Sequence, residues 1–332
     1  MSVGSRLPSG SAADVQARRP AIHVSLSRVG VTGVRKVIRI RANGAEQLFY
    51  AELECFVDLG PEQKGAHMSR FEEVIEEAID EVVIGEAFKA ETLAAHIAER
   101  VRDRQDGLRA EVTIASQYPE HKPAPVSGIQ TQEIYTLLGS AVASERGTRM
   151  LVGVEAQGMT ACPCAQEMLT GRARERLADD GFDEEEVDRI LDLVPVATHN
   201  QRGVGTLHVG YPEASDADIE ASTLLRIVES SMSSEIYELM KRSDEAEVVE
   251  KAHRRPRFVE DCVREMIRMA VEEFEPLGPE VFLSARQRNL ETIHQHDVVA
   301  ERHGLLGDLV REVAGDGSPV PHVTVRDWLE RA

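Results

Sequence analysis

Apolar and polar residues alternate along two long segments near the start of the chain. Residues 35–41 (RKVIRIR) and 47–57 (QLFYAELECFV) lie on either side of Asn43-Gly44, and Asn-Gly is the strongest short signal for a β-hairpin. Within 47–57 nearly every second residue is apolar, which predicts a strand with one buried and one solvated face. We therefore expect an antiparallel hairpin at the start of the folded chain.

A helical pattern follows the hairpin. Ser69 and Glu72 have the spacing of a capping box, and apolar residues then recur at helical intervals. Beyond this helix, the pattern predicts more helix to about residue 104, a strand at 110–116, a helix at 131–144 and a strand at 148–156.

The second half of the chain repeats this rhythm. The pattern predicts a strand at 203–211, mostly helix at 221–242, a helix at 257–274 and a strand at 280–288. Neither half contains a glycine-rich phosphate loop. We therefore expect a duplicated α+β fold, with antiparallel sheets and helices on one face, rather than a parallel nucleotide-binding sheet.

The same rhythm divides the chain into segments. We expect a disordered tail at 1–20, a first α+β unit at 21–157, a second unit with the polar motifs at 158–310, a helical insert within it at 165–193, and a C-terminal segment at 311–332. The insert ends in an acidic run, which favours a solvated surface over a binding site.

Composition narrows the range of functions. Hydrophobic residues make up 42% of the 332 residues, which is enough for a folded core. The formal net charge of −20 argues against nucleic acid as a partner, because binding phosphates requires the opposite sign. No apolar run approaches the roughly 20 residues of a membrane helix, and the first residues lack the apolar stretch of a signal peptide. We therefore expect no membrane association. With only four cysteines, we also expect reduced thiols and a cytoplasmic location.

Packing does not explain three polar clusters. Cys162 and Cys164 flank a proline after a predicted strand, His199 precedes the next strand, and His294 and His296 lie in the segment ETIHQHD. On an extended chain, two histidines separated by one residue project to the same side, which suits a transition metal. Taken alone, the cysteines could be two small buried side chains, and any single histidine an ordinary surface or core residue. Taken together, the clusters favour metal binding.

A fourth feature is Glu260, near the start of the helix predicted at 257–274. First-turn carboxylates most often complement the helix dipole. Alternatively, the carboxylate accepts two hydrogen bonds from a ligand such as the N1–H and amino group of guanine. The pattern leaves both roles open.

Six sequence blocks together resemble one enzyme family. They are QKGAHMSRF (63–71), GMTACPCAQ (158–166), THNQR (198–202), KRSDE (241–245), RFVED (257–261) and ETIHQHD (291–297). The set is similar to the type IB GTP cyclohydrolases, and most similar to their archaeal branch in methanopterin biosynthesis. The resemblance implies a tunnelling fold (T-fold), in which units of antiparallel strands and helices surround a channel. The two predicted units would then be T-fold units.

The resemblance also implies a reaction. A divalent metal activates water against C8 of GTP, the imidazole ring opens and formate leaves. Archaeal members form 7,8-dihydroneopterin 2′,3′-cyclic phosphate with loss of pyrophosphate, whereas bacterial relatives form 7,8-dihydroneopterin triphosphate. The implied cofactor is Fe²⁺, one per subunit, with Mn²⁺ or Zn²⁺ as alternatives. The implied assembly is a homo-oligomer, a dimer or tetramer, that binds GTP.

The family motifs carry roles over to particular residues of this chain. The implied catalytic residues are Cys162, Glu291 and His296. The implied metal ligands are Cys162, His199, Glu245, His294 and His296. The implied substrate contacts are Glu260, His67 and Arg70. For the block that holds His67 and Arg70, helix capping by Ser69 is almost as good an explanation.

The chain departs from the bacterial pattern in two places. Residues 165–193 separate Cys-Pro-Cys from THNQR, as in the archaeal branch, and Ser243 stands where the bacterial motif has proline. The alternatives are a bacterial-type enzyme that makes the triphosphate, a metal-free nitrile reductase of the same fold, and a non-catalytic purine- or metal-binding T-fold protein. The histidines of ETIHQHD argue against the nitrile reductase, and the presence of Cys162 and Glu260 argues against a non-catalytic protein.

Overall fold

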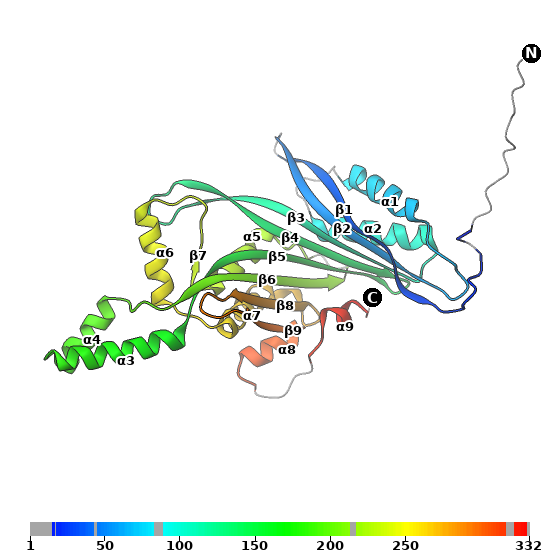
Figure 1. Cartoon of the computed structure of the whole chain (residues 1–332). Coiled ribbons are helices and arrows are strands. Elements are labelled where there is room, and N and C mark those ends of the chain that lie inside the picture. Colours follow the sequence, from blue (N-terminus) through cyan, green and yellow to red (C-terminus); the bar gives the residue numbers. More distant parts are fainter. Residues whose placement is uncertain are drawn as a thin grey trace, which may run out of the picture.

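The computed structural model describes residues 15–16, 18–42, 45–82, 89–212, 217–316 and 322–330. Within them the strands form one sheet in the order β1-β2-β3-β4-β5-β6-β8-β9, and the short β7 pairs with β5 (Figure 1). Every strand pair is antiparallel. Most of the expected tail at 1–20 lies outside the described residues, as does the Asn43-Gly44 turn.

The sheet begins with the hairpin that alternation predicted, and its pairing extends to Ala42 and Ala45. The strands are β1 (Leu26–Ala42), β2 (Ala45–Leu59), β3 (Arg109–Pro123), β4 (Gln130–Ser144), β5 (Gly147–Ala161), β6 (Asn200–Pro212), β7 (Ser234–Glu235), β8 (Phe282–Leu290) and β9 (Val298–Leu305).

The main helices cover one face of this sheet. α2 packs against β3, β4 and β5, α5 against β5 and β6, and α7 against β8 and β9, and together they enclose one continuous apolar core. The predicted α+β class with helices on one face is confirmed. The helices are α1 (Met68–Val82), α2 (Ala90–Gln105), α3 (Pro163–Asp179), α4 (Glu184–Leu193), α5 (Ala221–Ser231), α6 (Arg242–Arg254), α7 (Val259–Phe274), α8 (Leu306–Val313) and α9 (Val325–Leu329).

The order of elements is duplicated. The series β1, β2, α1, α2, β3, β4 is followed by β5, β6, α5, α7, β8, β9. The second series begins at Gly147, because β4 and β5 form a tight hairpin that pairs Ser144 with Gly147. The predicted boundary between 157 and 158 therefore falls inside β5, too late in the chain.

The helix predicted at 131–144 was wrong, since this segment is strand β4. It pairs with β3 along its whole length, and alternate residues are buried. Two of the buried positions are polar, Thr131 and Glu133, and their side chains hydrogen-bond to each other at 2.9 Å. Buried polar residues interrupt the apolar alternation by which a strand is recognised in sequence.

Two helix boundaries also differ from the prediction. The helix predicted over 221–242 ends at Ser231, because β7 adds briefly to the edge of β5 near Gly158 before α6 begins. Helix α1 begins at Met68, so Ser69 lies in its first turn and not at the cap. The capping explanation for the 63–71 block is therefore wrong.

Two segments stand apart from the main core. The residues expected as a helical insert form α3 and α4, a pair that projects from the sheet (Figure 1). The C-terminal α9 packs against the sheet through Trp328, whose ring stacks on Phe282 at 5.6 Å. Among the described helices, none is long and apolar enough to cross a membrane.

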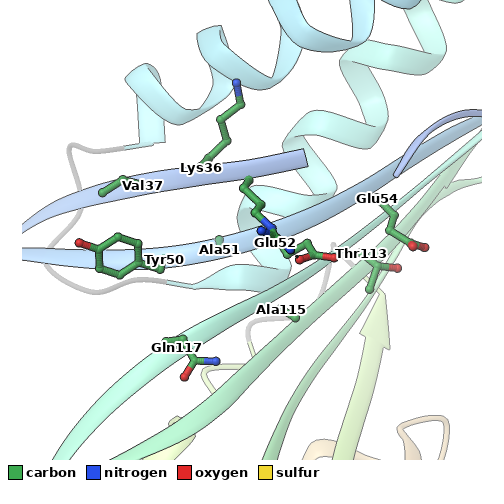
Figure 2. A pocket seen from close by; sticks show the side chains of 10 residues that line it. Lys36, Val37, Tyr50, Ala51, Glu52, Glu54, Thr113, Ala115 and Gln117 are labelled. Atoms are coloured by element: carbon green, nitrogen blue, oxygen red, sulfur yellow. Dashed lines mark hydrogen bonds and ion pairs between the residues drawn. The ribbon is translucent and has the colours of Figure 1, made fainter. Parts of the chain in front are cut away.

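The face of β1–β3 opposite the helices is exposed and hollowed, and it carries polar side chains as well as Val37 and Tyr50. A cavity of about 570 Å³ there is lined by residues that include Glu52, Glu54, Thr113 and Gln117 (Figure 2). The charged and polar side chains on this face agree with a sheet that has one core-facing and one solvated side.

Candidate active site

Strands β5 and β8 end, and β6 begins, at the same edge of the sheet, the one formed by strand ends. β5 ends at Ala161, which pairs with Asn200 at the start of β6, and β8 ends at Leu290 beside β6. The residues that follow or precede these ends, Cys162, His199 and Glu291, therefore lie at one edge although they are far apart in sequence.

Backbone hydrogen bonds join the first two of these residues. The Cys162 N–H donates to the His199 carbonyl at 3.1 Å, and the Thr198 hydroxyl donates to the Cys162 carbonyl at 3.0 Å. Cys162 is also the N-cap residue of α3, with Pro163 in the first turn. The Cys-Pro-Cys and THNQR motifs thus meet across the ends of β5 and β6.

Unsatisfied polar atoms mark this edge. His199 Nδ1 and Glu291 Oε2 are buried and have no hydrogen-bond partner within the described chain. Buried polar groups in folded proteins almost always have partners, so an orphaned atom points to a bound ligand, an ion, water or a catalytic role. Imidazole nitrogen, carboxylate oxygen and thiol sulfur are all donors that suit a divalent transition metal.

The remaining histidines lie on the loop after β8. The rings of His294 and His296 stack with centroids 5.3 Å apart and planes 13° apart, and both residues are exposed. The hydroxyl of Thr292 donates to the Asn200 carbonyl at 3.1 Å, which holds the base of this loop at the start of β6.

Glu245 lies on the first turn of α6 and is exposed. It lines a cavity of about 610 Å³ together with Pro195 and Ala197, which lead to His199. The far end of α6 reaches the same segment, since His253 Nε2 lies 3.2 Å from the Thr198 carbonyl.

Asp244 fixes the start of α6, and sequence reasoning did not select it. Its carboxylate accepts hydrogen bonds from the Val126 N–H, the Ser127 N–H and hydroxyl, and the Lys241 N–H. Burial alone would raise the pKa of Asp244, but these hydrogen bonds outweigh it and hold the pKa well below its usual range. The only sequence signal for Asp244 was its position beside Glu245 in the first turn of the helix.

Glu260 lies on the first turn of α7, close to the site. The Arg257 N–H donates to the Ala161 carbonyl at 3.0 Å, so α7 begins beside the end of β5. The helix is capped by Asp261, which accepts from the Phe258 N–H at 3.0 Å. Glu260 is exposed and lines a cavity of about 530 Å³. The cap is thus supplied by its neighbour, which leaves the Glu260 carboxylate available to a ligand.

His67 and Arg70 lie at the opposite edge of the sheet. They line a cavity of about 520 Å³ beside the end of β2 and the start of β3, and the Arg70 guanidinium donates to the Arg104 carbonyl at 2.9 Å. β5 has 15 residues, so roughly 50 Å separate the two edges. These two residues and Cys162 of the same chain cannot contact one GTP molecule.

The structure therefore distributes the expected site residues over several places. Within the described ranges, no three His, Cys, Asp or Glu side chains gather closely enough to form a metal site. Cys162, His199 and Glu291 share one edge, Glu245 and Glu260 begin two helices near it, and His294 and His296 lie on an exposed loop.

Comparison with known proteins identifies the family. Residues 12–300 match the family model described as type I GTP cyclohydrolase folE2. The chain belongs to this family. It is 42% identical over 307 residues to GTP cyclohydrolase MptA of Methanococcus aeolicus, covering 90% of this chain and 99% of that protein. It is also 42% identical to GTP cyclohydrolase MptA of Methanocaldococcus jannaschii, covering 90% and 97%.

Among solved structures, the chain is similar to uricase from Arthrobacter globiformis, with a TM-score of 0.49 and 10% sequence identity over 89% of this chain and 96% of that one. For a type I GTP cyclohydrolase, the residues at the β5–β6–β8 edge fit the expected chemistry. A thiol, an imidazole nitrogen and a carboxylate oxygen are present, and two of the three have unsatisfied polar atoms.

Proposed function

We propose that this chain is an MptA-type GTP cyclohydrolase. It hydrolyses GTP at C8, releases formate and pyrophosphate, and forms 7,8-dihydroneopterin 2′,3′-cyclic phosphate for methanopterin biosynthesis. The observation that carries the proposal is the meeting of Cys162, His199 and Glu291, with orphaned polar atoms, in a chain 42% identical to MptA proteins.

The proposed cofactor is one Fe²⁺ per subunit, with Mn²⁺ or Zn²⁺ as alternatives. Its ligands are drawn from Cys162, His199, Glu245, His294 and His296. When bound, such an ion supplies a Lewis acid that makes water a strong nucleophile near neutral pH. The support is the donor set, since thiol, imidazole and carboxylate groups suit these metals.

The other roles belong to side chains that act on protons and on the guanine ring. Glu291 is positioned to hold a proton at Oε2, the buried oxygen that has no partner in the described chain, and His296 is a second proton carrier. Glu260 accepts hydrogen bonds from the N1–H and amino group of guanine, because Asp261 already caps its helix.

We further propose that the enzyme is a cytoplasmic homo-oligomer, a dimer or tetramer. The support is the position of His67 and Arg70, roughly 50 Å along the sheet from Cys162. If all three residues contact GTP, the first two must come from a second subunit.

The direct test is anaerobic incubation of the purified protein with GTP and Fe²⁺, followed by oxidation and detection of fluorescent pterin. Mass spectrometry of the product separates the cyclic phosphate from the triphosphate of bacterial-type enzymes. Formation of the triphosphate would overturn the MptA assignment, and absence of any pterin with Fe²⁺, Mn²⁺ or Zn²⁺ would overturn the cyclohydrolase activity itself.

A further inference from the structure

A row of polar side chains crosses three adjacent strands just inside the candidate active site. Thr160 of β5 pairs directly with Gln201 of β6, and the register between β6 and β8 places Gln201 beside Glu291. Directly paired residues of neighbouring strands project from the same face of a sheet. Thr160 is 0% exposed and Gln201 is 6% exposed, so these two lie in the interior, and Glu291 is half-buried at the end of the row.

The row contains one hydrogen bond and several unsatisfied atoms. Gln201 Nε2 donates to Glu291 Oε1 at 3.3 Å. Thr160 Oγ1, Gln201 Oε1 and Glu291 Oε2 are buried without a partner in the described chain. One Glu291 oxygen is therefore held by an amide, and the other remains free.

A second pair of amides lies deeper along β8 on the same face. Gln287 Nε2 donates to Asn289 Oδ1 at 3.0 Å, and both residues are almost fully buried. The lack of a side chain at Gly203 makes room for them, since a Cβ there would lie 2.3 Å from Gln287 Nε2. Because Gln287 already occupies the Asn289 oxygen, this acceptor does not compete with Glu291 for the Gln201 amide.

We propose that Gln201 is the positioning residue for Glu291. Its amide holds Oε1 of the carboxylate and so directs Oε2 toward the edge that carries Cys162 and His199. A carboxylate with no donor in this interior would rotate out of the row, because a buried charge needs hydrogen bonds. The proposal rests on the proposed function, in which Glu291 handles a proton.

The test is a double-mutant cycle with Gln201→Met and Glu291→Met, of which the second removes both carboxylate oxygens. Methionine keeps the length of the side chain and removes the amide donor. We expect Gln201→Met to lower kcat about 10- to 100-fold, the usual range for residues that orient a site, with KM within about twofold. In the Glu291→Met background, Gln201→Met should change kcat by less than about twofold, since no acceptor is left at position 291 for the amide to orient. Full additivity of the two losses would overturn the proposal.

The matched control is Gln287→Met. It makes the same chemical change in the same buried layer, at a residue that hydrogen-bonds to Asn289 and not to Glu291. We expect it to shift the melting temperature about as much as Gln201→Met while kcat stays within about twofold. A loss of kcat equal to that of Gln201→Met would show a general packing effect and overturn the positioning role.

Melting temperatures of the metal-free proteins provide a readout that is independent of turnover. The two substitutions of the cycle should be non-additive there as well, because they remove the same hydrogen bond. If the wild-type protein fails to convert GTP, the proposed function falls, and the melting cycle still decides whether Gln201 holds Glu291. Additive melting shifts would show that it does not.

Discussion

At the scale of single residues, the four cysteines differ in their surroundings. Cys55 and Cys262 are buried in the core, and burial raises the pKa of each thiol to about 12. Neither thiol is available as a nucleophile or ligand near neutral pH. Cys162 and Cys164 lie at the surface end of β5, so chemistry that needs a thiolate falls to this pair.

Substituting Cys162 by Ala should abolish pterin formation and leave the fold intact. The side chain is only partly buried, so little packing is lost, and we expect a fall in kcat of more than about 10³-fold with a stability change of about 0.5 kcal/mol or less. Fluorescent pterin assays and thermal unfolding measure the two quantities. Cys164→Ala is the control and should retain most of the activity. Equal losses in the two variants would remove the special role of Cys162.

Glu260→Gln and Asp261→Asn should have opposite effects. The first removes the charge proposed to bind guanine, and should cost about 1.5–3 kcal/mol of substrate binding per hydrogen bond with little change in melting temperature. The second weakens the helix cap seen at Phe258 N–H, and should lower stability by about 1 kcal/mol with near-normal GTP kinetics. Destabilised Glu260→Gln with normal kinetics would show that this residue is only structural.

His208 should make stability depend on pH. It is partly buried on the sheet face opposite the main helices, and desolvation lowers its pKa from 6.5 to about 4. The unfolded chain then binds the proton more readily than the folded one, so acidification from pH 6.5 to 4 favours unfolding by about 1–3 kcal/mol. The difference in melting temperature between wild type and His208→Gln should be constant above about pH 6.5, and wild type should lose stability relative to the variant as the pH falls toward 4. Parallel curves would contradict the shift.

At the scale of elements, α2 and the inserted helix α3 differ in how closely they pack on the sheet. The start of α2 lies directly on β4, where a Cβ at Gly139 would approach the Ala90 carbonyl carbon to 2.3 Å and the Glu91 nitrogen to 2.5 Å. In contrast, α3 has no buried residue. Helix α2 is therefore fixed by close backbone contact with β4, whereas the projecting pair α3–α4 is supported mainly at its base.

Gly139→Ala should destabilise the protein, and Gly171→Ala should not. The first forces backbone against backbone and should cost at least about 1–3 kcal/mol, because neither strand nor helix can move aside cheaply. The second lies within α3 with nothing within 4 Å of its Cβ position, and should add about 0.5–1 kcal/mol to the stability of that helix. Thermal or urea unfolding compares the two. A normal melting temperature for Gly139→Ala would contradict the packing of α2 on β4.

At the scale of the whole molecule, the two candidate substrate regions lie at opposite edges of one sheet. If each site is shared between two subunits, a Cys162 variant and a variant of both His67 and Arg70 lack different parts of the site. Each variant is then inactive alone, but a mixed dimer has one complete site. Mixing the two inactive variants should restore activity to roughly a quarter of wild type in a random dimer, since half of the dimers are mixed and each has one intact site.

The measurement requires dissociation, mixing and reassembly, followed by the pterin assay and light scattering. Each variant refolded alone is the control and should stay inactive. Absence of recovery in a sample that light scattering shows to be oligomeric would mean that the site is completed within one chain.

The sequence by itself determined the class of fold, the β1–β2 hairpin and the identity of the family. Alternation of apolar residues predicts a strand wherever its buried face is apolar, and it failed at β4 because Thr131 and Glu133 are buried polar residues. The motifs also selected Cys162 and His199, since thiol and imidazole groups in such patterns have few purely structural roles.

Only the tertiary structure decided which of these residues share a site. Register between strands sets which side chains lie beside one another, and a shift of one residue would turn each side chain to the other face. The pairing of β5, β6 and β8 brings Cys162, His199 and Glu291 to one edge and reveals Gln201 beside them. The same sheet places His67 at its far end, a strand length away from Cys162. The similarity of a motif does not show this distance, because a motif says nothing about how far apart its residues lie in the fold.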